Sequence, residues 1–138
     1  MVLSVFVDNT ITLVGPAGQI EELRDGWVGF RFIGAHRYPG TDTIEAQYTT
    51  QTEWKPVIDL VLENAQQFLA TDFQLEWAST KIPEWNGLAQ IRECEVYVAV
   101  DGELDDIRHL GNLFEIKQKG FWKCLEDLRE EHGRSTSS

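Results

Sequence analysis

The spacing of apolar residues changes several times along the chain and predicts a mixture of strands and helices. Apolar and polar residues alternate over residues 44–50, 73–77 and 94–100, which is the pattern of strands with one face in water. Residues 27–33 also look extended. Helical spacing is clearest over residues 56–69, where apolar positions follow the helical period behind a proline at a favourable first position.

The N-terminal segment, residues 2–14, allows two interpretations. It is rich in β-branched and aromatic residues, but Asp8 and Asn9 interrupt it, and both residue types favour turns. It therefore forms either a hairpin that turns at these residues or one strand with a kink there. A short helix is predicted over residues 19–25, and the glycines and proline of residues 34–40 predict a loop.

Helical spacing returns from about Asp105, and Gly120 predicts two helices or one broken helix. Residues 1–132 are expected to form one domain, whereas residues 133–138 lack an apolar anchor and predict a flexible tail. The order of the elements predicts an α+β fold. We expect a ferredoxin-like split βαβ sandwich, with a mainly antiparallel sheet, helices packed on one face, and an extra C-terminal helical region.

Several segments resemble the YubB-like family of phage- and plasmid-encoded proteins. The resemblance lies in the Asn-Thr-Ile-Thr-Leu-Val-Gly-Pro run of residues 9–16, the strand ending in Thr and Trp before Pro56, and the closing hairpin formed by residues 73–77, Gly87 and residues 94–100. It covers about residues 7–100. The resemblance implies a ferredoxin-like fold of mobile-element origin, and it implies no established activity and no catalytic residues.

The charge of the chain excludes one class of function. It has 23 Asp and Glu against 12 Lys and Arg, for a formal net charge of −11. Direct binding to nucleic acid needs a basic face that displaces counterions from the phosphates, so the composition instead fits a basic protein partner. Without a leader pattern or a long apolar run, the chain is expected to be cytoplasmic and not bound to a membrane.

The residues that usually carry catalysis show no productive spacing. The three histidines lie far apart in the sequence, and Cys94 and Cys124 fall among apolar positions, where reduced, buried thiols are expected. The acidic run over residues 101–106 lacks the spacing of an EF-hand. We therefore expect no enzymatic activity, no metal and no cofactor.

Acidic residues instead gather in two stretches. Residues 41–76 and residues 82–106 each contain seven acids and one base. The leading hypothesis is a non-catalytic inhibitor that binds a basic, nucleic-acid-handling host protein, such as a defence nuclease, by presenting carboxylates where phosphates would dock. The residues predicted to bind this partner are acids of these stretches and two tryptophans beside prolines: Glu45, Trp54, Glu76, Trp85, Glu93, Glu95, Asp101, Glu103, Asp105 and Asp106.

Two other classes of function stay open at this point. A small-molecule-binding or enzymatic domain could use the 34–40 loop, with His36, Arg37 and Tyr38 as its polar groups. A structural homodimer could pair through a sheet edge or through the C-terminal helices. The composition distinguishes neither a monomer from a dimer nor one basic partner from another.

Overall fold

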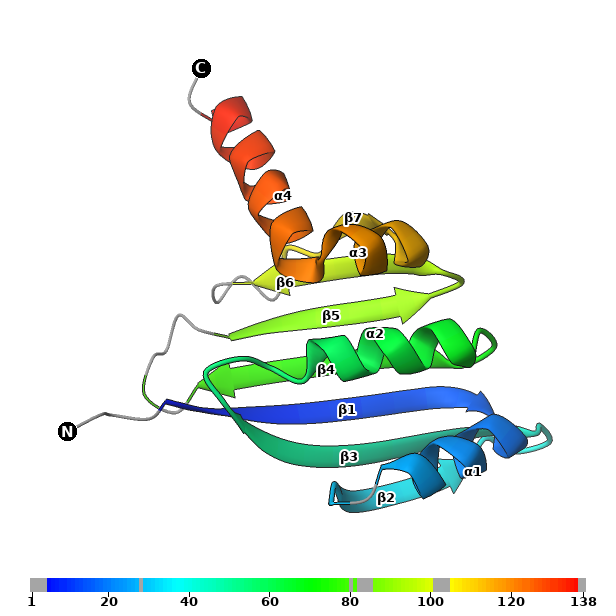
Figure 1. The fold of residues 1–138 in the computed structure, drawn as a ribbon. Coiled ribbons are helices and arrows are strands. Elements are labelled where there is room, and N and C mark those ends of the chain that lie inside the picture. Colours follow the sequence, from blue (N-terminus) through cyan, green and yellow to red (C-terminus); the bar gives the residue numbers. More distant parts are fainter. Residues whose placement is uncertain (1–4, 28, 80, 82–85, 101–104, 137–138) are drawn as a thin grey trace.

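Over the residues that the structure describes, the fold consists of one seven-stranded antiparallel sheet and four helices (Figure 1). The computed structural model describes residues 5–27, 29–79, 81, 86–100 and 105–136. In chain order the elements are β1 (Phe6–Pro16), α1 (Ala17–Gly26), β2 (Arg31–Arg37), β3 (Thr43–Glu53), α2 (Ile58–Gln67), β4 (Asp72–Ser79), β5 (Asn86–Arg92), β6 (Glu95–Val100), β7 (Arg108–Asn112), α3 (Leu113–Lys119) and α4 (Phe121–Thr136). The strands lie in the order β2-β3-β1-β4-β5-β6-β7.

Helices α1, α2 and α3 lie on the same side of the sheet, and α4 begins on that side and runs out past the β6–β7 end (Figure 1). The hydrophobic core fills the space between the helices and the sheet, because alternate residues of each central strand point toward the helices. In β1 these residues are Val7, Ile11 and Leu13, and all three are fully buried. Their neighbours in β4 are Leu75 and Phe73, which are also buried. The other half of the strand residues point to the opposite side of the sheet, which we call the open face.

The α+β class, the antiparallel sheet and the helical C-terminal region are confirmed. A ferredoxin-like fold is not confirmed, because the sheet has seven strands and its order continues past β4 through β5, β6 and β7. Strand β5 was not expected, because three successive residues, Gly87, Leu88 and Ala89, are buried. Its sequence therefore lacks the alternation of apolar and polar residues that indicates a strand. The break at Gly120 is confirmed: this residue has a φ of 97° and separates α3 from α4.

The N-terminal segment forms the single strand β1, and the hairpin interpretation is wrong. Asn9 stays inside the strand, where its buried side chain bonds to distant backbone. Its Nδ2 donates to the carbonyl of Thr50 at 3.1 Å and to Oγ1 of Thr52 at 2.9 Å, and its Oδ1 accepts from the amide of Val57 at 3.0 Å. Asn9 thus joins β1 to β3 and to the start of α2.

Two further expectations are corrected by pairing between strands. The predicted 34–40 loop is largely strand, because Gly34 to Arg37 pair with β3 after a β-bulge between Phe32 and Gly34. Residues from about 105 were expected to be helical, but Arg108–Asn112 form the edge strand β7 on β6. Helix α3 begins only at Leu113, where the side chain of Asn112 accepts a hydrogen bond from the amide of Phe114.

A candidate interaction surface on the open face of the sheet

The open face carries rows of polar side chains that run across the strands. Neighbouring strands place residues side by side in register, and every second residue of a strand points to this face. One row comprises Gln47, Thr12, Gln74, Gln90, Tyr97 and His109, in the order β3-β1-β4-β5-β6-β7. The next row toward one end of the sheet contains Glu45, Val14 and Asp72, followed by the cross-strand pair of Arg92 and Glu95.

Three of the predicted partner-binding acids come together on this face. Glu45 lies on β3, Glu76 on β4 and Glu95 on β6, and each alternates with buried residues of its own strand. The fold adds two acids that the sequence analysis missed, Asp8 on β1 and Asp72 at the start of β4. A signal for Asp72 was present in the sequence, because it directly precedes the inward-facing Phe73. Asp8 was hidden by its assignment to a turn.

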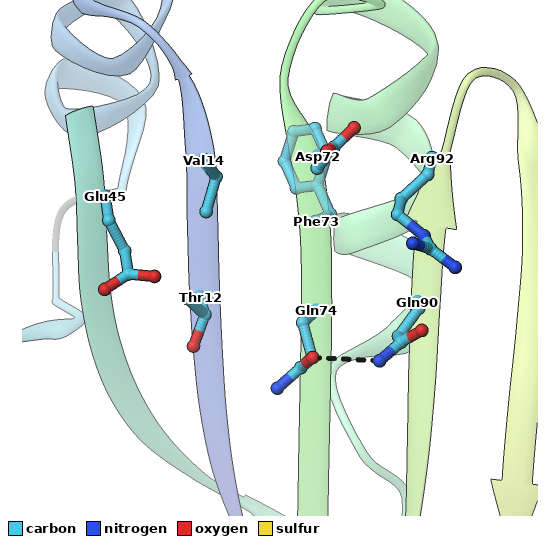
Figure 2. Close-up of a pocket in the computed structure, with 8 residues that line it drawn as sticks. All are labelled: Thr12, Val14, Glu45, Asp72, Phe73, Gln74, Gln90 and Arg92. Carbon is cyan, nitrogen blue, oxygen red and sulfur yellow. Dashed lines mark hydrogen bonds between the residues drawn. The ribbon is translucent and has the colours of Figure 1, made fainter. Parts of the chain in front are cut away.

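Two adjoining hollows lie on the open face along the row that contains Glu45 and Asp72. Figure 2 shows the first, of about 270 Å³, whose lining residues come from the neighbouring strands β3, β1, β4 and β5: Thr12, Val14, Glu45, Asp72, Phe73, Gln74, Gln90 and Arg92. The second, of about 350 Å³, is lined by Asp72, Arg92, Glu93, Glu95 and Tyr97. Asp72 and Arg92 line both hollows, which therefore adjoin at these two residues. We call the two hollows together the acidic groove.

Hydrogen bonds within and between strands fix polar side chains in and beside the groove. The amide of Gln90 donates to Oε1 of Gln74 at 3.1 Å (Figure 2), and the amide of Gln74 donates to Oε1 of Glu76 at 3.0 Å. On the other side, the amide of Gln47 donates to Oγ1 of Thr12 at 3.3 Å. These bonds hold the side chains in place, and the carboxylate of Glu76 keeps its negative charge.

Histidines accompany two of the acids. Nε2 of His109 lies 2.8 Å from Oε2 of Glu95, and Nε2 of His36 lies 3.5 Å from Oε2 of Glu45. The hydroxyl of Tyr38 donates to Oε1 of Glu45 at 3.2 Å. All these groups are partly in solvent, so the two carboxylates stay accessible to a partner.

Asp72 and Arg92, which line both hollows of the groove, carry opposite charges that influence each other. Partial burial raises the pKa of the Asp72 carboxyl, the positive charge of Arg92 acts in the opposite direction, and the negative charge of Glu93 raises the pKa further. The guanidinium of Arg92 also lies over the ring of Tyr97, 5.2 Å from its centroid. Arg92 is thus the cation around which Asp72, Glu93 and Glu95 are arranged.

The structure places the other predicted residues in different positions. Glu93 lies in the β5–β6 turn and lines the groove. Trp54 follows β3 with 51% of its surface exposed, and Asp105 and Asp106 are exposed before β7, where Asp106 bonds to Arg108 at 2.9 Å. None of these last three lines the groove. Trp85, Asp101 and Glu103 lie outside the described residues.

The residues considered for a small-molecule site lie on strand β2 and directly after it. His36 and Arg37 belong to β2, and Tyr38 follows them. An open hollow of about 230 Å³ lies beside Gly34, Ala35 and His36. Among the described residues, no group of three His, Cys, Asp or Glu side chains is placed to hold a metal ion. Burial raises the pKa of the Cys124 thiol, which makes its reactive thiolate form less available.

Comparison of the chain with protein-family models, curated proteins and solved structures finds no match. The resemblance to the YubB-like family therefore stays a prediction. Within the part of the chain that the structure describes, no helix combines the length and the apolar character needed to cross a membrane.

Proposed function

We propose that this protein is a non-catalytic binding domain that inhibits a basic, nucleic-acid-handling host protein through its acidic groove. One observation carries the proposal: acids far apart in the sequence lie on the one face of the sheet that the described helices leave open. These are Asp8, Glu45, Asp72, Glu76 and Glu95, from the four strands β1, β3, β4 and β6.

The spacing of the carboxylates supports this proposal. Glu45, Asp72 and Glu95 lie on alternate strands, β3, β4 and β6, in the order of the sheet. Because adjacent strands are about 4.8 Å apart, these acids repeat at intervals of about 10 Å across the face. A basic channel that follows a nucleic-acid backbone presents Lys and Arg along its length, so a row of fixed carboxylates can pair with several of them at once.

The mechanism is steric and electrostatic occlusion. The charge of −11 attracts a basic surface over a long range and raises the association rate. Once docked, the sheet face covers the nucleic-acid site. The hydrogen bonds among Gln74, Gln90 and Glu76 restrict side chains before docking, which lowers the entropy lost on binding.

The proposed origin rests on the arrangement of the first half of the chain. The elements β1, α1, β2, β3, α2 and β4 follow one another in a β-α-β-β-α-β order, and their strands are adjacent and antiparallel. That arrangement supports a ferredoxin-like unit extended by β5, β6 and β7. We propose that the chain is a YubB-like protein of mobile-element origin that acts in the cytoplasm.

Two variants with equal charge changes test the proposal. The groove variant carries Glu45→Gln, Asp72→Asn and Glu95→Gln. The control variant carries Glu22→Gln, Glu63→Gln and Glu126→Gln, three exposed acids of α1, α2 and α4. Each variant removes three negative charges, so any difference between them reports the position of the charge rather than its sum.

Both variants and the unmodified protein are used as bait in a host lysate at low salt, and captured proteins are eluted with high salt. We expect a basic nucleic-acid-binding protein that the unmodified and control baits capture and the groove variant does not. With that partner purified, its association rate should fall for the groove variant alone, and duplex DNA should compete for it. Equal capture by all three baits, or equal loss from both variants, would contradict the proposal.

A further inference from the structure

Among the strands that the structure describes, β2 is an outer edge of the sheet and pairs on one side only, with β3 (Figure 1). Six of its seven residues are exposed, and the remaining one, Gly34, is partly exposed. The backbone donors and acceptors along the outer side of such a strand can form a further ladder with an added strand.

Apolar and aromatic surface accompanies this edge. Phe32 is 43% exposed and Ile33 is 53% exposed. The ring of Phe32 lies 5.3 Å from that of Tyr48, and the guanidinium of Arg24 lies over it at 5.1 Å. Phe32 is therefore packed against Tyr48 and Arg24 on the helix face and keeps part of its ring exposed.

The charge of this edge is opposite to that of the protein as a whole. Arg31 and Arg37 lie at the two ends of β2, His36 lies beside Arg37, and the strand contains no acidic residue. Arg24 adds a further cation above Phe32. Arg37 lies 3.7 Å from Asp42, but both side chains are largely exposed, so that pair contributes little and can exchange partners.

We propose that β2 binds an extended acidic segment of a partner protein as an additional strand of the sheet. Arg31 lies on the open face, beside Thr49, whereas Phe32 and Arg37 lie on the helix face, beside Tyr48 and Ile44. A carboxylate on the open face of the added segment pairs with Arg31; on its helix face an apolar side chain packs on Phe32 and a second carboxylate pairs with Arg37. This edge adjoins the acidic groove, because Nε2 of His36 lies 3.5 Å from Oε2 of Glu45, but it neither requires nor excludes the function proposed above.

A second copy of the chain fits this edge poorly. The bulge between Phe32 and Gly34 breaks the ladder of a regular pairing of two β2 strands. Each copy would also bring Arg31 and Arg37 and no acidic residue of β2 to the shared edge, so the pairing gains no compensating charge. The edge therefore selects a partner by charge.

The probe for this site is a capped synthetic peptide that carries Glu at adjacent positions near each end, so that carboxylates lie on both faces of the added strand, and a Phe at its centre. At low salt we expect it to bind with a dissociation constant on the order of 100 μM. The same peptide with Lys in place of Glu should not bind. Arg31→Ser combined with Arg37→Ser should weaken binding about three- to tenfold, whereas Lys117→Ser combined with Lys119→Ser removes equal charge from α3 and should leave it unchanged.

N-methylated peptides distinguish strand addition from simple charge attraction. Only alternate amides of a strand face the neighbouring strand. Methylation of one alternate set should therefore abolish binding, and methylation of the other set should preserve it. Arg31→Lys combined with Arg37→Lys should retain binding, because both positive charges are kept. An unchanged urea midpoint of the serine variant shows that its loss of binding is not unfolding.

Three results would overturn the proposal: no binding of the acidic peptide at millimolar concentration, equal binding of the Lys peptide, or equal effects of the two methylation patterns. Light scattering that shows a dimer, together with loss of that dimer in Arg31→Glu, would assign the edge to a second copy instead.

Discussion

Nε2 of His109 on β7 lies 2.8 Å from Oε2 of Glu95 on β6, so the outermost pair of strands is joined on the open face by an imidazole and a carboxylate. The imidazole ring also lies against Tyr97, with ring centroids 5.3 Å apart. Both partners of the pair are substantially exposed, at 54% and 39%. The pair therefore positions Glu95 in the acidic groove more than it stabilises the fold.

A double-mutant cycle checks this role. Glu95→Gln, His109→Gln and the double variant should give a coupling energy of about 0–1 kcal/mol in urea unfolding at neutral pH, because exposed pairs lose most of their attraction to solvent. A coupling above about 2 kcal/mol would show that the pair is structural. In that case the Glu95→Gln change would be unsuitable for testing partner binding.

Asn9 is expected to be the polar side chain on which the fold depends most. Asn9→Ala removes the acceptor of the Val57 amide and the donor to the Thr50 carbonyl in a buried setting. Unfolding free energy should fall by about 2–4 kcal/mol, measured by urea denaturation. Thr12→Ala is the matched control on the same strand, since Thr12 faces the open side, and it should cost less than about 1 kcal/mol.

The turn between β5 and β6 stores strain that a substitution can relieve. Glu93 and Cys94 have φ values of 52° and 65°, a region that L-residues other than Asn, Asp and Gly adopt reluctantly. Glu93→Asn should raise the thermal midpoint, with a gain of about 0.5–1 kcal/mol. Glu53→Asn changes the same residue type in a strand and should give no gain. A loss of stability in Glu93→Asn would contradict the strain argument.

The outward acids could be predicted from the sequence because alternation is a local signal. Once Phe73, Leu75 and Trp77 are assigned to the core, Glu76 must point the other way, and the same holds for Glu95 beside Val96. What the alternation does not contain is the order of the strands. That Glu45 and Asp72 lie in one row depends on β1 lying between β3 and β4, which is decided by packing across the whole sheet.

The incorrect predictions have the same cause, because they too concern contacts between segments that are far apart in the sequence. Asn9 next to Asp8 is a turn signal within its own segment, but its partners Thr50 and Val57 lie 41 and 48 residues away. Leu110 fitted a helical spacing from Asp105 onward, and only the unpaired edge of β6 explains why this segment is a strand. The β2 edge could not be recognised at all, because a strand is an edge only by its place in the finished sheet.

Asp72 predicts how stability depends on pH. Burial raises its pKa in the folded protein above the ordinary value, so the folded state holds the proton more tightly than the unfolded chain. The corresponding stabilisation is present at low pH and is lost as the pH rises through the raised pKa. Asp72→Asn should abolish this component, seen as a flatter dependence of the urea midpoint on pH over the acidic range.

Arg92 supplies the matched test of the same carboxyl. Its positive charge lowers the pKa of Asp72, so Arg92→Gln should raise that pKa further and move the loss of stability to higher pH. The titration can be followed directly through the carboxyl carbon resonance of Asp72 by NMR. An unchanged titration in Arg92→Gln would show that the guanidinium does not act on this carboxyl, and the charge arrangement described for the acidic groove would then be wrong.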